Sequence, residues 1–312
     1  MQTLSVSLFG RFRIANAQDA IAGLQQRRAQ ELLSYLLLHR DRAYPREALA
    51  SLLWEDADAT QARKYLRQAL WQVQTALQAF LGADAKKLLS LEGDWVQLNS
   101  VACLSLDVAQ FERAVDACQG THGAHLSDVQ RDELERAIQL YRGDLLEGCY
   151  QDWCLFERER LQNSYLVALD KIVACCDARG CVDRGLFHAE MILRCDPTEE
   201  QAHYHIMHMH WLAGHRTRAM RQYQLCEKTL LQELDVQPSE RTKKLYDQIR
   251  ADQIESSPEN ALTFQSNALQ LDTEGLTGLM TSFQHLQTQL ANIEEQLKRD
   301  IHVVAAALKK RL

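Results

Sequence analysis

The sequence predicts a mainly α-helical protein whose N-terminal part is a winged helix-turn-helix domain of mixed α and β structure. Three patterns predict this class. Apolar and polar residues alternate over the first fifteen positions, apolar residues then recur at helical spacing, and a heptad-like repeat fills the C-terminal end. We divide the chain into a winged-helix domain (residues 1–100), an all-α, tetratricopeptide-like domain (101–252), a linker (253–275) and a coiled-coil helix (276–312).

The winged-helix prediction follows from the order of elements within the first hundred residues. Two short strands are expected on either side of Gly10, where the alternating apolar residues are Leu4, Val6, Leu8, Phe12 and Ile14. A first helix carries leucines at helical spacing over residues 32–37. A second helix begins at Tyr44-Pro45, because a proline in the first turn costs no helical hydrogen bond. A third helix is expected over residues 59–80 after Asp58 as N-cap, and a hairpin joins residues 88–91 to 95–98.

The third predicted helix has two faces of different chemistry. Its apolar face consists of Ala62, Leu66, Ala69, Leu70, Val73, Leu77 and Phe80. Its opposite face has no acidic residue and consists of Thr60, Arg63, Lys64, Arg67, Gln68, Trp71, Gln74 and Thr75. Arginine and lysine can meet DNA phosphates and glutamine can hydrogen-bond base edges, so this face is predicted to bind double-stranded DNA, aided by Lys86 and Lys87 before the hairpin. A basic face exposed only to solvent is the alternative.

The distribution of charge permits this interpretation. The chain has a formal net charge of −7, but residues 1–100 carry 12 Lys and Arg against 10 Asp and Glu. Residues 101–254 carry 18 against 25, so most of the acidity lies in the helical part. Because the field at the contact helix decides whether DNA binds, an acidic chain with a local basic stripe is compatible with DNA binding.

The stretch from Leu106 to Ile249 is expected to be helical throughout and to contain an internal repeat. Gly180 and Gly214 are 34 residues apart, and Gly185 and Ala219 repeat this offset as small residues. A period of 34 is typical of tetratricopeptide helix pairs, which stack into curved arrays.

A polar linker and an apolar seam follow the helical part. Residues 253–275 lose the helical pattern and are rich in polar side chains. The seam predicts a coiled coil for self-association or for a protein partner, and consists of Leu279, Phe283, Leu286, Leu290, Ile293, Leu297, Ile301, Val304 and Leu308. A single amphipathic helix folded onto its own domain is the alternative.

Histidines gather in one predicted helix and offer a competing site. His203, His205, His208 and His210 fall within eight residues, and neutral imidazoles can bind zinc or nickel. No cysteine or carboxylate completes a familiar metal-site spacing, so we interpret these residues as half-buried positions of a repeat helix and predict no metal and no cofactor. A protonation switch at these histidines is a further alternative.

The remaining signals concern compartment and catalysis. The nine cysteines show no paired spacing typical of a zinc site and lie among apolar neighbours, which predicts free thiols in a reducing compartment. A redox sensor at Cys175, Cys176 and Cys181 is the alternative. No apolar stretch could span a bilayer and no signal peptide is recognised, so we expect a cytoplasmic protein. No nucleophile elbow, metalloprotease motif or Gly-rich phosphate loop occurs, so an enzyme is not expected. The alternating charges of residues 157–160 predict a solvated helix face.

Short motifs follow one another in order along residues 3–250. They are LFGRF at 8–12, REAL at 46–49, LW at 53–54, LRQAL at 66–70, LDVAQF at 106–111, LYRGDLL at 140–146, Trp153, ERERL at 157–161, DPTEE at 196–200, AGHR at 213–216, Tyr223, EL at 233–234 and QPS at 237–239. The ordered set resembles the bacterial transcriptional activators of the antibiotic-regulatory-protein type, which combine an OmpR-like winged helix with a bacterial transcriptional activator domain. Members of this family bind promoter repeats and help to recruit RNA polymerase, so the resemblance implies a DNA-binding activator.

Two departures from the family pattern bear on function. The family's third helix usually ends in a leucine followed by arginines, whereas this chain has VQTAL at residues 73–77, so two positive charges are missing. Phosphate affinity should then fall or depend on Arg63, Lys64 and Arg67, since each lost phosphate contact removes about 0.9 units of salt dependence. The second departure is the coiled-coil tail, which stands where larger family members carry an ATPase domain.

The sequence thus predicts a sequence-specific DNA-binding regulator that acts as an activator. The rival interpretation is a protein-interaction scaffold, in which the repeat array and coiled coil bind proteins and the winged helix is weak or vestigial. A metal-responsive regulator is the third.

Overall fold

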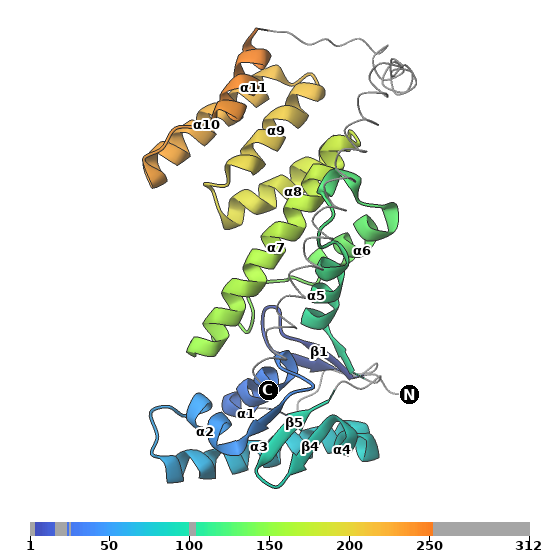
Figure 1. The fold of residues 1–312 in the computed structure, drawn as a ribbon, viewed down its shortest axis with the longest axis vertical. Helices are drawn as coiled ribbons and strands as arrows, with labels where there is room; N and C mark the ends of the chain where they lie inside the picture. The colour runs from blue at the N-terminus through green and yellow to red at the C-terminus, as the bar shows by residue number, and fades with distance from the viewer. Residues whose placement is uncertain (1–3, 16–23, 25, 100–103, 252–312) are drawn as a thin grey trace, which may run out of the picture. The chain divides into compact units, whose positions relative to one another are not determined.

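The structure is a computed structural model that describes residues 4–15, 24, 26–99 and 104–251, all within one compact unit (Figure 1). The predicted linker and the predicted coiled-coil seam, from Leu279 to Leu308, lie outside the described residues. Among the described residues, no helix is long and apolar enough to cross a bilayer.

The N-terminal part combines three main helices with two small sheets. Its elements are β1 (Leu4–Ser7), β2 (Arg13–Ala15), α1 (Arg27–Leu38), β3 (Ala43–Pro45), α2 (Arg46–Leu53), α3 (Ala59–Leu81), η1 (Gly82–Asp84), α4 (Ala85–Leu88), β4 (Leu89–Glu92), β5 (Trp95–Leu98) and β6 (Leu104–Leu106). One sheet has the order β2-β1-β6, with β1 antiparallel to β2 and parallel to β6; the other is antiparallel, with the order β3-β5-β4. This order of elements confirms the predicted winged-helix class.

Pro45 takes a different place from the one predicted. It is the N-cap of α2 and the last residue of β3, rather than a residue of the first helical turn. It pairs with Trp95 across the sheet, and the next amide, that of Arg46, donates to the Asp94 carbonyl at 2.8 Å. A proline fits here because β3 is an edge strand, where a missing N–H breaks no ladder hydrogen bond.

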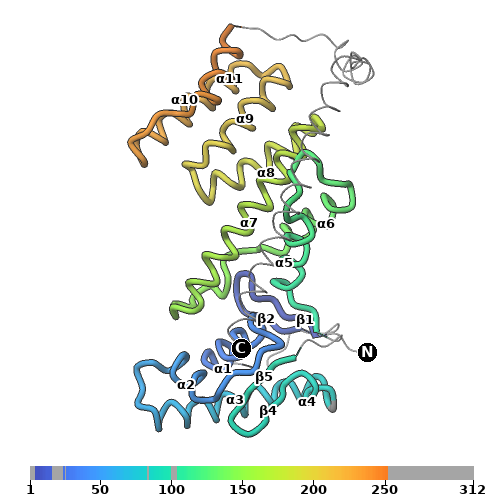
Figure 2. Tube along the Cα trace, in the orientation of Figure 1, coloured from blue at the N-terminus to red at the C-terminus, as the bar shows by residue number. Residues whose placement is uncertain are grey.

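The C-terminal part is a succession of helices, each packed against the next (Figure 2). They are α5 (Asp107–Ala117), α6 (Asp128–Ile138), α7 (Asp152–Ala178), α8 (Val182–Cys195), α9 (Glu200–Leu212), α10 (Arg216–Leu234) and α11 (Glu240–Arg250), with a short 3-10 helix η2 (Gly123–His125). The expectation of continuous helix from Leu106 was wrong for residues 139–151, which form a connection whose backbone groups bond to the N-terminal sheet.

The positions of the predicted repeat have a clear geometric role. Gly180 and Gly214 follow the ends of α7 and α9 with φ of 68° and 74°, a backbone region in which glycine carries no Cβ penalty. Gly185 lies where α8 meets α9, because a Cβ there would stand 2.3 Å from the Met209 sulfur. Ala219, its counterpart in α10, is fully buried. The assignment to the tetratricopeptide type stays a prediction.

A buried carboxylate joins the N-terminal sheet to α5. Both oxygens of Asp107, the first residue of α5, accept from the Leu8 amide at 2.9 and 3.0 Å. One also accepts from the Phe9 amide at 3.0 Å, and the other from Val108 at 2.7 Å. Burial raises the pKa of Asp107, and the amide hydrogen bonds act in the opposite direction. The carboxylate satisfies backbone donors that have no strand partner at the end of β1.

The other side of the same segment bonds to the connection before α7. The Gly10 amide donates to the Asp144 carbonyl at 2.9 Å, and the amides of Leu146 and Glu147 donate to the carbonyls of Leu8 and Gly10 at 2.9 and 2.8 Å. Residues 8–10 are therefore held between α5 and residues 144–147. We call this arrangement the 8–10 clamp.

Arg158 of α7 stabilises the connection that forms the clamp. Its guanidinium donates to the carbonyls of Leu145, Leu146 and Cys149 at 2.9–3.2 Å. The interpretation of residues 157–160 as a solvated charged face was therefore wrong for Arg158, whose side chain satisfies carbonyls that no helix or strand engages.

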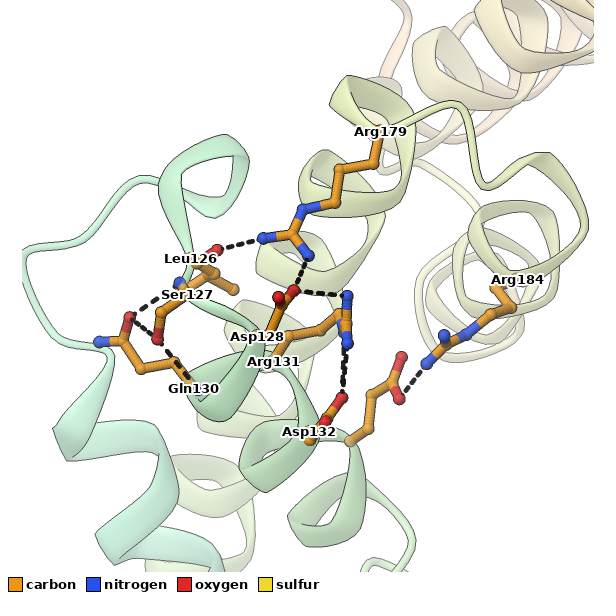
Figure 3. Close-up of polar contacts among 9 residues, drawn as sticks. Leu126, Ser127, Asp128, Gln130, Arg131, Asp132, Arg179 and Arg184 are labelled. Carbon is orange, nitrogen blue, oxygen red and sulfur yellow. Dashed lines mark hydrogen bonds and ion pairs between the residues drawn. The ribbon is translucent and has the colours of Figure 1, made fainter.

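Figure 3 shows how the N-terminus of α6 is tied to the following helices. A capping box closes its first turn. Arg179, the C-cap of α7, donates to the Asp128 carboxylate and to the Leu126 carbonyl, and lowers the pKa of Asp128. Arg184 of α8 forms an ion pair with Glu135 of α6. These contacts fix α6 against both α7 and α8.

A carboxylate shared by two histidines links α7 to α9. Asp177 of α7 lies 2.8 Å from Nδ1 of His205 and 2.7 Å from Nδ1 of His208. Burial alone would raise the pKa of Asp177, but the two histidine hydrogen bonds and charges outweigh burial and lower this pKa to about 2. The group therefore stays ionised at the interface of the two helices.

Replacing Asp107 should destabilise the fold strongly. In Asp107→Ala the amides of Leu8 and Phe9 lose their acceptor in a buried place, so we expect the free energy of unfolding to fall by about 2–4 kcal/mol. Asp107→Asn keeps one acceptor oxygen and should lose less. Asp116→Ala, an exposed change on the same helix, should stay within about 0.5 kcal/mol of the wild type in urea unfolding followed by circular dichroism. Equal losses for Asp107→Ala and Asp116→Ala would contradict the clamp.

The contribution of Asp177 should depend on pH. Its folded pKa of about 2 lies below the ordinary value of 3.8, so the unfolded chain takes up the proton first as the pH falls. The stabilisation, ~2 kcal/mol, should be complete above about pH 4 and lost as the pH falls through about 4 toward about 2. Urea unfolding at several pH values should show the advantage of the wild type over Asp177→Asn shrinking in acid. Asp170→Asn, exposed on α7, serves as the control; a pH-independent advantage would rule out this role for Asp177.

Candidate nucleic-acid interface

Helix α3 is built by a strong N-terminal cap and a regular apolar stripe. The Asp58 side chain accepts from the amides of Thr60 and Gln61 at 3.0 Å each, which satisfies two of the donors that a helix leaves free at its start. The residues that α3 buries are Ala62, Leu66, Ala69, Leu70, Val73, Ala76 and Leu77. They follow helical spacing, so one side of this 23-residue helix is fixed on the core formed with α1 and α2. Phe80, predicted for the same stripe, is only half-buried.

The opposite side of α3 is fully accessible. Every residue predicted for it is exposed: Thr60, Arg63, Lys64, Arg67, Gln68, Trp71, Gln74 and Thr75. We call this set the outward face of α3. At about 1.5 Å per residue it is about 22 Å long. No acidic residue occurs between Ala59 and Leu81, so the helix itself contributes only positive charge to this surface.

The three basic residues of the outward face differ in their electrostatic surroundings. Arg63 forms an ion pair with Glu47 of α2 at 2.6 Å, although both side chains are more than half exposed. Among the described residues, Lys64 and Arg67 form no ion pair within 4.0 Å. An exposed pair such as Arg63–Glu47 contributes little to stability, roughly 0–1 kcal/mol, so a phosphate can compete for Arg63.

The polar members of the outward face are oriented for contacts away from the core. Trp71, in the middle of the face, is 64% exposed, which is unusual for the largest apolar side chain. Thr75 donates its hydroxyl to the Trp71 carbonyl at 2.8 Å, so its side chain is occupied by its own helix. Gln68 and Gln74 are exposed. The face thus combines cations for phosphates with amides that can read base edges.

The predicted wing is present as the β4–β5 hairpin, and it lies with α3 at the lower end of Figure 1. Lys86 and Lys87 are exposed on α4, the short helix before β4, and Lys87 pairs with Asp84 at 2.8 Å. Trp95 at the start of β5 is 52% exposed, and sequence analysis did not select it. The sequence pattern could have predicted this exposure, because Trp95 alternates with the buried Val96 in the strand directly after the turn.

The histidine cluster does not converge on one point. His205 and His208 share Asp177, whereas His203 contacts the Pro197 carbonyl at 3.0 Å and Gln222 at 2.7 Å. Burial lowers the pKa of both His203 and His210. Within the part of the chain that the structure describes, no three His, Cys, Asp or Glu side chains are grouped to hold a metal ion.

Two of the three cysteines considered as an alternative redox sensor are part of the core. Cys175 and Cys176 are buried in α7, and burial raises the pKa of both thiols, that of Cys176 to about 11. All eight cysteines that the structure describes are free thiols.

Comparison with known proteins identifies a domain model, a relative and a solved structure that this chain is similar to. A model of the bacterial transcriptional activator domain matches residues 106–250. Regulatory protein AfsR of Streptomyces coelicolor is 25% identical over 234 residues, which make up 75% of this chain and 23% of AfsR, so the chain spans about a quarter of that relative. EmbR of Mycobacterium tuberculosis, solved in complex with a low-affinity phosphopeptide, superimposes with a TM-score of 0.68 at 18% identity, covering 86% of this chain and 70% of the EmbR chain.

The agreement extends over both described parts of the molecule. The likeness to EmbR shows a common fold, mainly helical with a small N-terminal sheet region. Residues 106–250 match the bacterial transcriptional activator domain, and together with the similarity to AfsR this match confirms the resemblance to transcriptional activators of the antibiotic-regulatory-protein type.

Proposed function

We propose that this chain is a cytoplasmic, sequence-specific DNA-binding transcriptional regulator that uses the outward face of α3 to contact the major groove. The single observation that carries the proposal is that this face exposes eight polar, basic or aromatic side chains and no acidic one. A helix of about 10–12 Å diameter fits a groove of about 12 Å width. In this arrangement the buried leucines hold the helix while its other side meets DNA.

The DNA contact that we propose for each side chain follows from its surroundings in the structure. Lys64 and Arg67 meet phosphates directly, because neither has an ion-pair partner among the described residues. Arg63 exchanges Glu47 for a phosphate on binding. Gln68 and Gln74 hydrogen-bond base edges, where a bidentate contact to adenine discriminates by about 1–3 kcal/mol. Lys86 and Lys87 approach the backbone beside the wing.

The helical domain and the C-terminal segment complete the proposal. The match to a bacterial transcriptional activator domain and the name of the relative AfsR support an activator that binds promoter repeats and contacts RNA polymerase. Self-association through Phe283, Leu286, Leu290, Ile293, Leu297, Ile301, Val304 and Leu308 would raise the affinity for repeated half-sites by avidity. We propose no catalytic role and no cofactor.

Removing the two cations without ion pairs should weaken DNA binding in a salt-dependent way. For Lys64→Ala plus Arg67→Ala we expect the slope of log affinity against log salt to fall by about 1.8, since each phosphate contact accounts for about 0.9. Fluorescence anisotropy with a random-sequence DNA duplex measures this slope. Arg218→Ala plus Arg221→Ala on α10 removes the same charge from an exposed helix and should leave the slope unchanged. Equal slopes for wild type and both double variants would favour the scaffold over the DNA-binding regulator.

Neutralising Glu47 should strengthen DNA binding. Glu47→Gln removes the carboxylate that competes for Arg63, so we expect higher affinity for the same duplex and a slope steeper by up to about 0.9. Glu233→Gln, which neutralises an exposed acid on α10, provides the matched control. If Glu47→Gln gained no more affinity than Glu233→Gln, Arg63 would not contact phosphate.

A further inference from the structure

Two cysteines lie together where the 8–10 clamp meets α7. Cys149 is in the connection before α7, and Cys154 is in the first turn of that helix. Both side chains are buried, with 5% and 0% of their residue surface exposed. The side chains of Cys149 and Cys154 interact with one another, and the Cys154 thiol also donates to the Leu145 carbonyl at 3.9 Å.

The surroundings of Cys149 favour its thiolate. Besides the hydrogen bond from Cys154, its sulfur accepts from the amide of Gln151, which is the N-cap residue of the 27-residue α7. The positive end of a long helix stabilises a thiolate. The Arg27 guanidinium, which bonds to the Gly148 carbonyl, adds positive charge, whereas Glu31, which pairs with Arg27, has a larger effect in the opposite direction. Together these groups lower the pKa of Cys149 against the effect of burial.

Cys149 is within reach of small solutes despite its burial. It lines a cavity of about 370 Å³ together with Arg27, Glu31, Gly148 and others. The cavity is large enough for several water molecules, each of which occupies about 30 Å³ in the liquid. Cys154 does not line this cavity. A small oxidant that enters the cavity therefore reaches Cys149 before Cys154.

We propose that Cys149 and Cys154 form a peroxide-reactive dithiol that closes to an intrachain disulfide. The Cys149 thiolate attacks one peroxide oxygen, the O–O bond breaks, and the leaving hydroxide takes up the proton released from the thiol. This gives water and a sulfenic acid on Cys149. Cys154 then attacks that sulfur, the S–O bond breaks, and a second water leaves with the Cys154 proton. The two sulfurs lose two electrons in total and the peroxide gains them.

The same criteria exclude four of the other six cysteines that the structure describes. Burial raises the pKa of Cys175, Cys176 and Cys226, that of Cys226 to about 12, so these thiols are poor nucleophiles. Cys195 is exposed, yet partial burial and two nearby carboxylates raise its pKa as well. We therefore predict that the buried Cys149 reacts with peroxide before the exposed Cys195 does, so that solvent exposure alone does not determine which thiol reacts.

The position of the pair gives its oxidation a structural consequence. Arg158 of α7 donates to the Cys149 carbonyl, and the amide of Leu146 in the same connection donates to the Leu8 carbonyl. A bond between the two sulfurs constrains this connection directly against the first turn of α7. The 8–10 clamp is thus the part of the fold that lies next to the proposed disulfide.

The test uses the reduced full-length chain and hydrogen peroxide at equimolar amounts. Remaining thiols are blocked with iodoacetamide, and tryptic peptides are measured by mass spectrometry. Both cysteines fall in one peptide, residues 143–158, so the disulfide makes this peptide lighter by two hydrogens without a cross-linked partner. We expect it to convert before the Cys195 peptide is modified, and dithiothreitol to reverse the change. Oxidation of Cys195 first, or an unmodified 143–158 peptide, would overturn the proposal.

Two variants separate the two steps of the reaction. Cys154→Ser should stop at the sulfenic acid, which dimedone traps on Cys149, whereas Cys149→Ser should leave Cys154 reduced. Cys195→Ser is the matched control and should form the disulfide like the wild type. Trapping of dimedone on Cys154 in Cys149→Ser would reverse the assigned order and contradict the proposal. The order in which the 143–158 peptide and the Cys195 peptide are oxidised is measured in the wild type, so this test does not depend on whether a variant folds.

Discussion

The fold depends on the way in which residues 8–10 are held between two segments far away in sequence. On one side the Asp107 carboxylate accepts hydrogen bonds from the amides of Leu8 and Phe9. On the other side residues 144–147 form backbone hydrogen bonds with Leu8 and Gly10. The hydrogen bonds to Asp107 are buried, and an unpaired amide in such a place costs about 1–3 kcal/mol. They bring the end of β1 onto the helical domain, so the short N-terminal sheet is completed by residues that belong to the helical part.

This clamp matters for function because the outward face of α3 is useful only on a rigid support. The apolar stripe of α3 fixes the helix on α1 and α2. The side-chain amide of Gln151, in the connection before α7, donates to the Leu53 carbonyl at the end of α2. Aromatic contact between Tyr35 of α1 and Trp153 of α7, with ring centroids 5.3 Å apart, adds to this link. The helices that support the outward face of α3 and the helices from α5 to α9 thus share one hydrophobic core.

Periodicity was sufficient to predict the elements with strong local signals. The stripe from Ala62 to Leu77 and the cap at Asp58 identified α3, and the alternation around Gly93 identified the hairpin. Periodicity could not predict contacts between residues that are far apart in the sequence. The pairing of Arg63 with Glu47 depends on how α2 crosses α3. The role of Arg158 depends on backbone carbonyls of the preceding connection, and the alternating charges of residues 157–160 do not reveal these carbonyls. The partner of His205 and His208 could not be predicted for the same reason, because spacing along α9 does not reveal Asp177 on α7.

The most direct measurement is photo-crosslinking of the full-length chain to duplex DNA from position 71, in the middle of the outward face. A benzophenone amino acid replacing Trp71, which is 64% exposed, should crosslink to DNA in a salt-sensitive manner. The same probe replacing Val129, 67% exposed on α6, should not. Equal crosslinking from both positions, or none from position 71, would contradict the claim that α3 meets the groove.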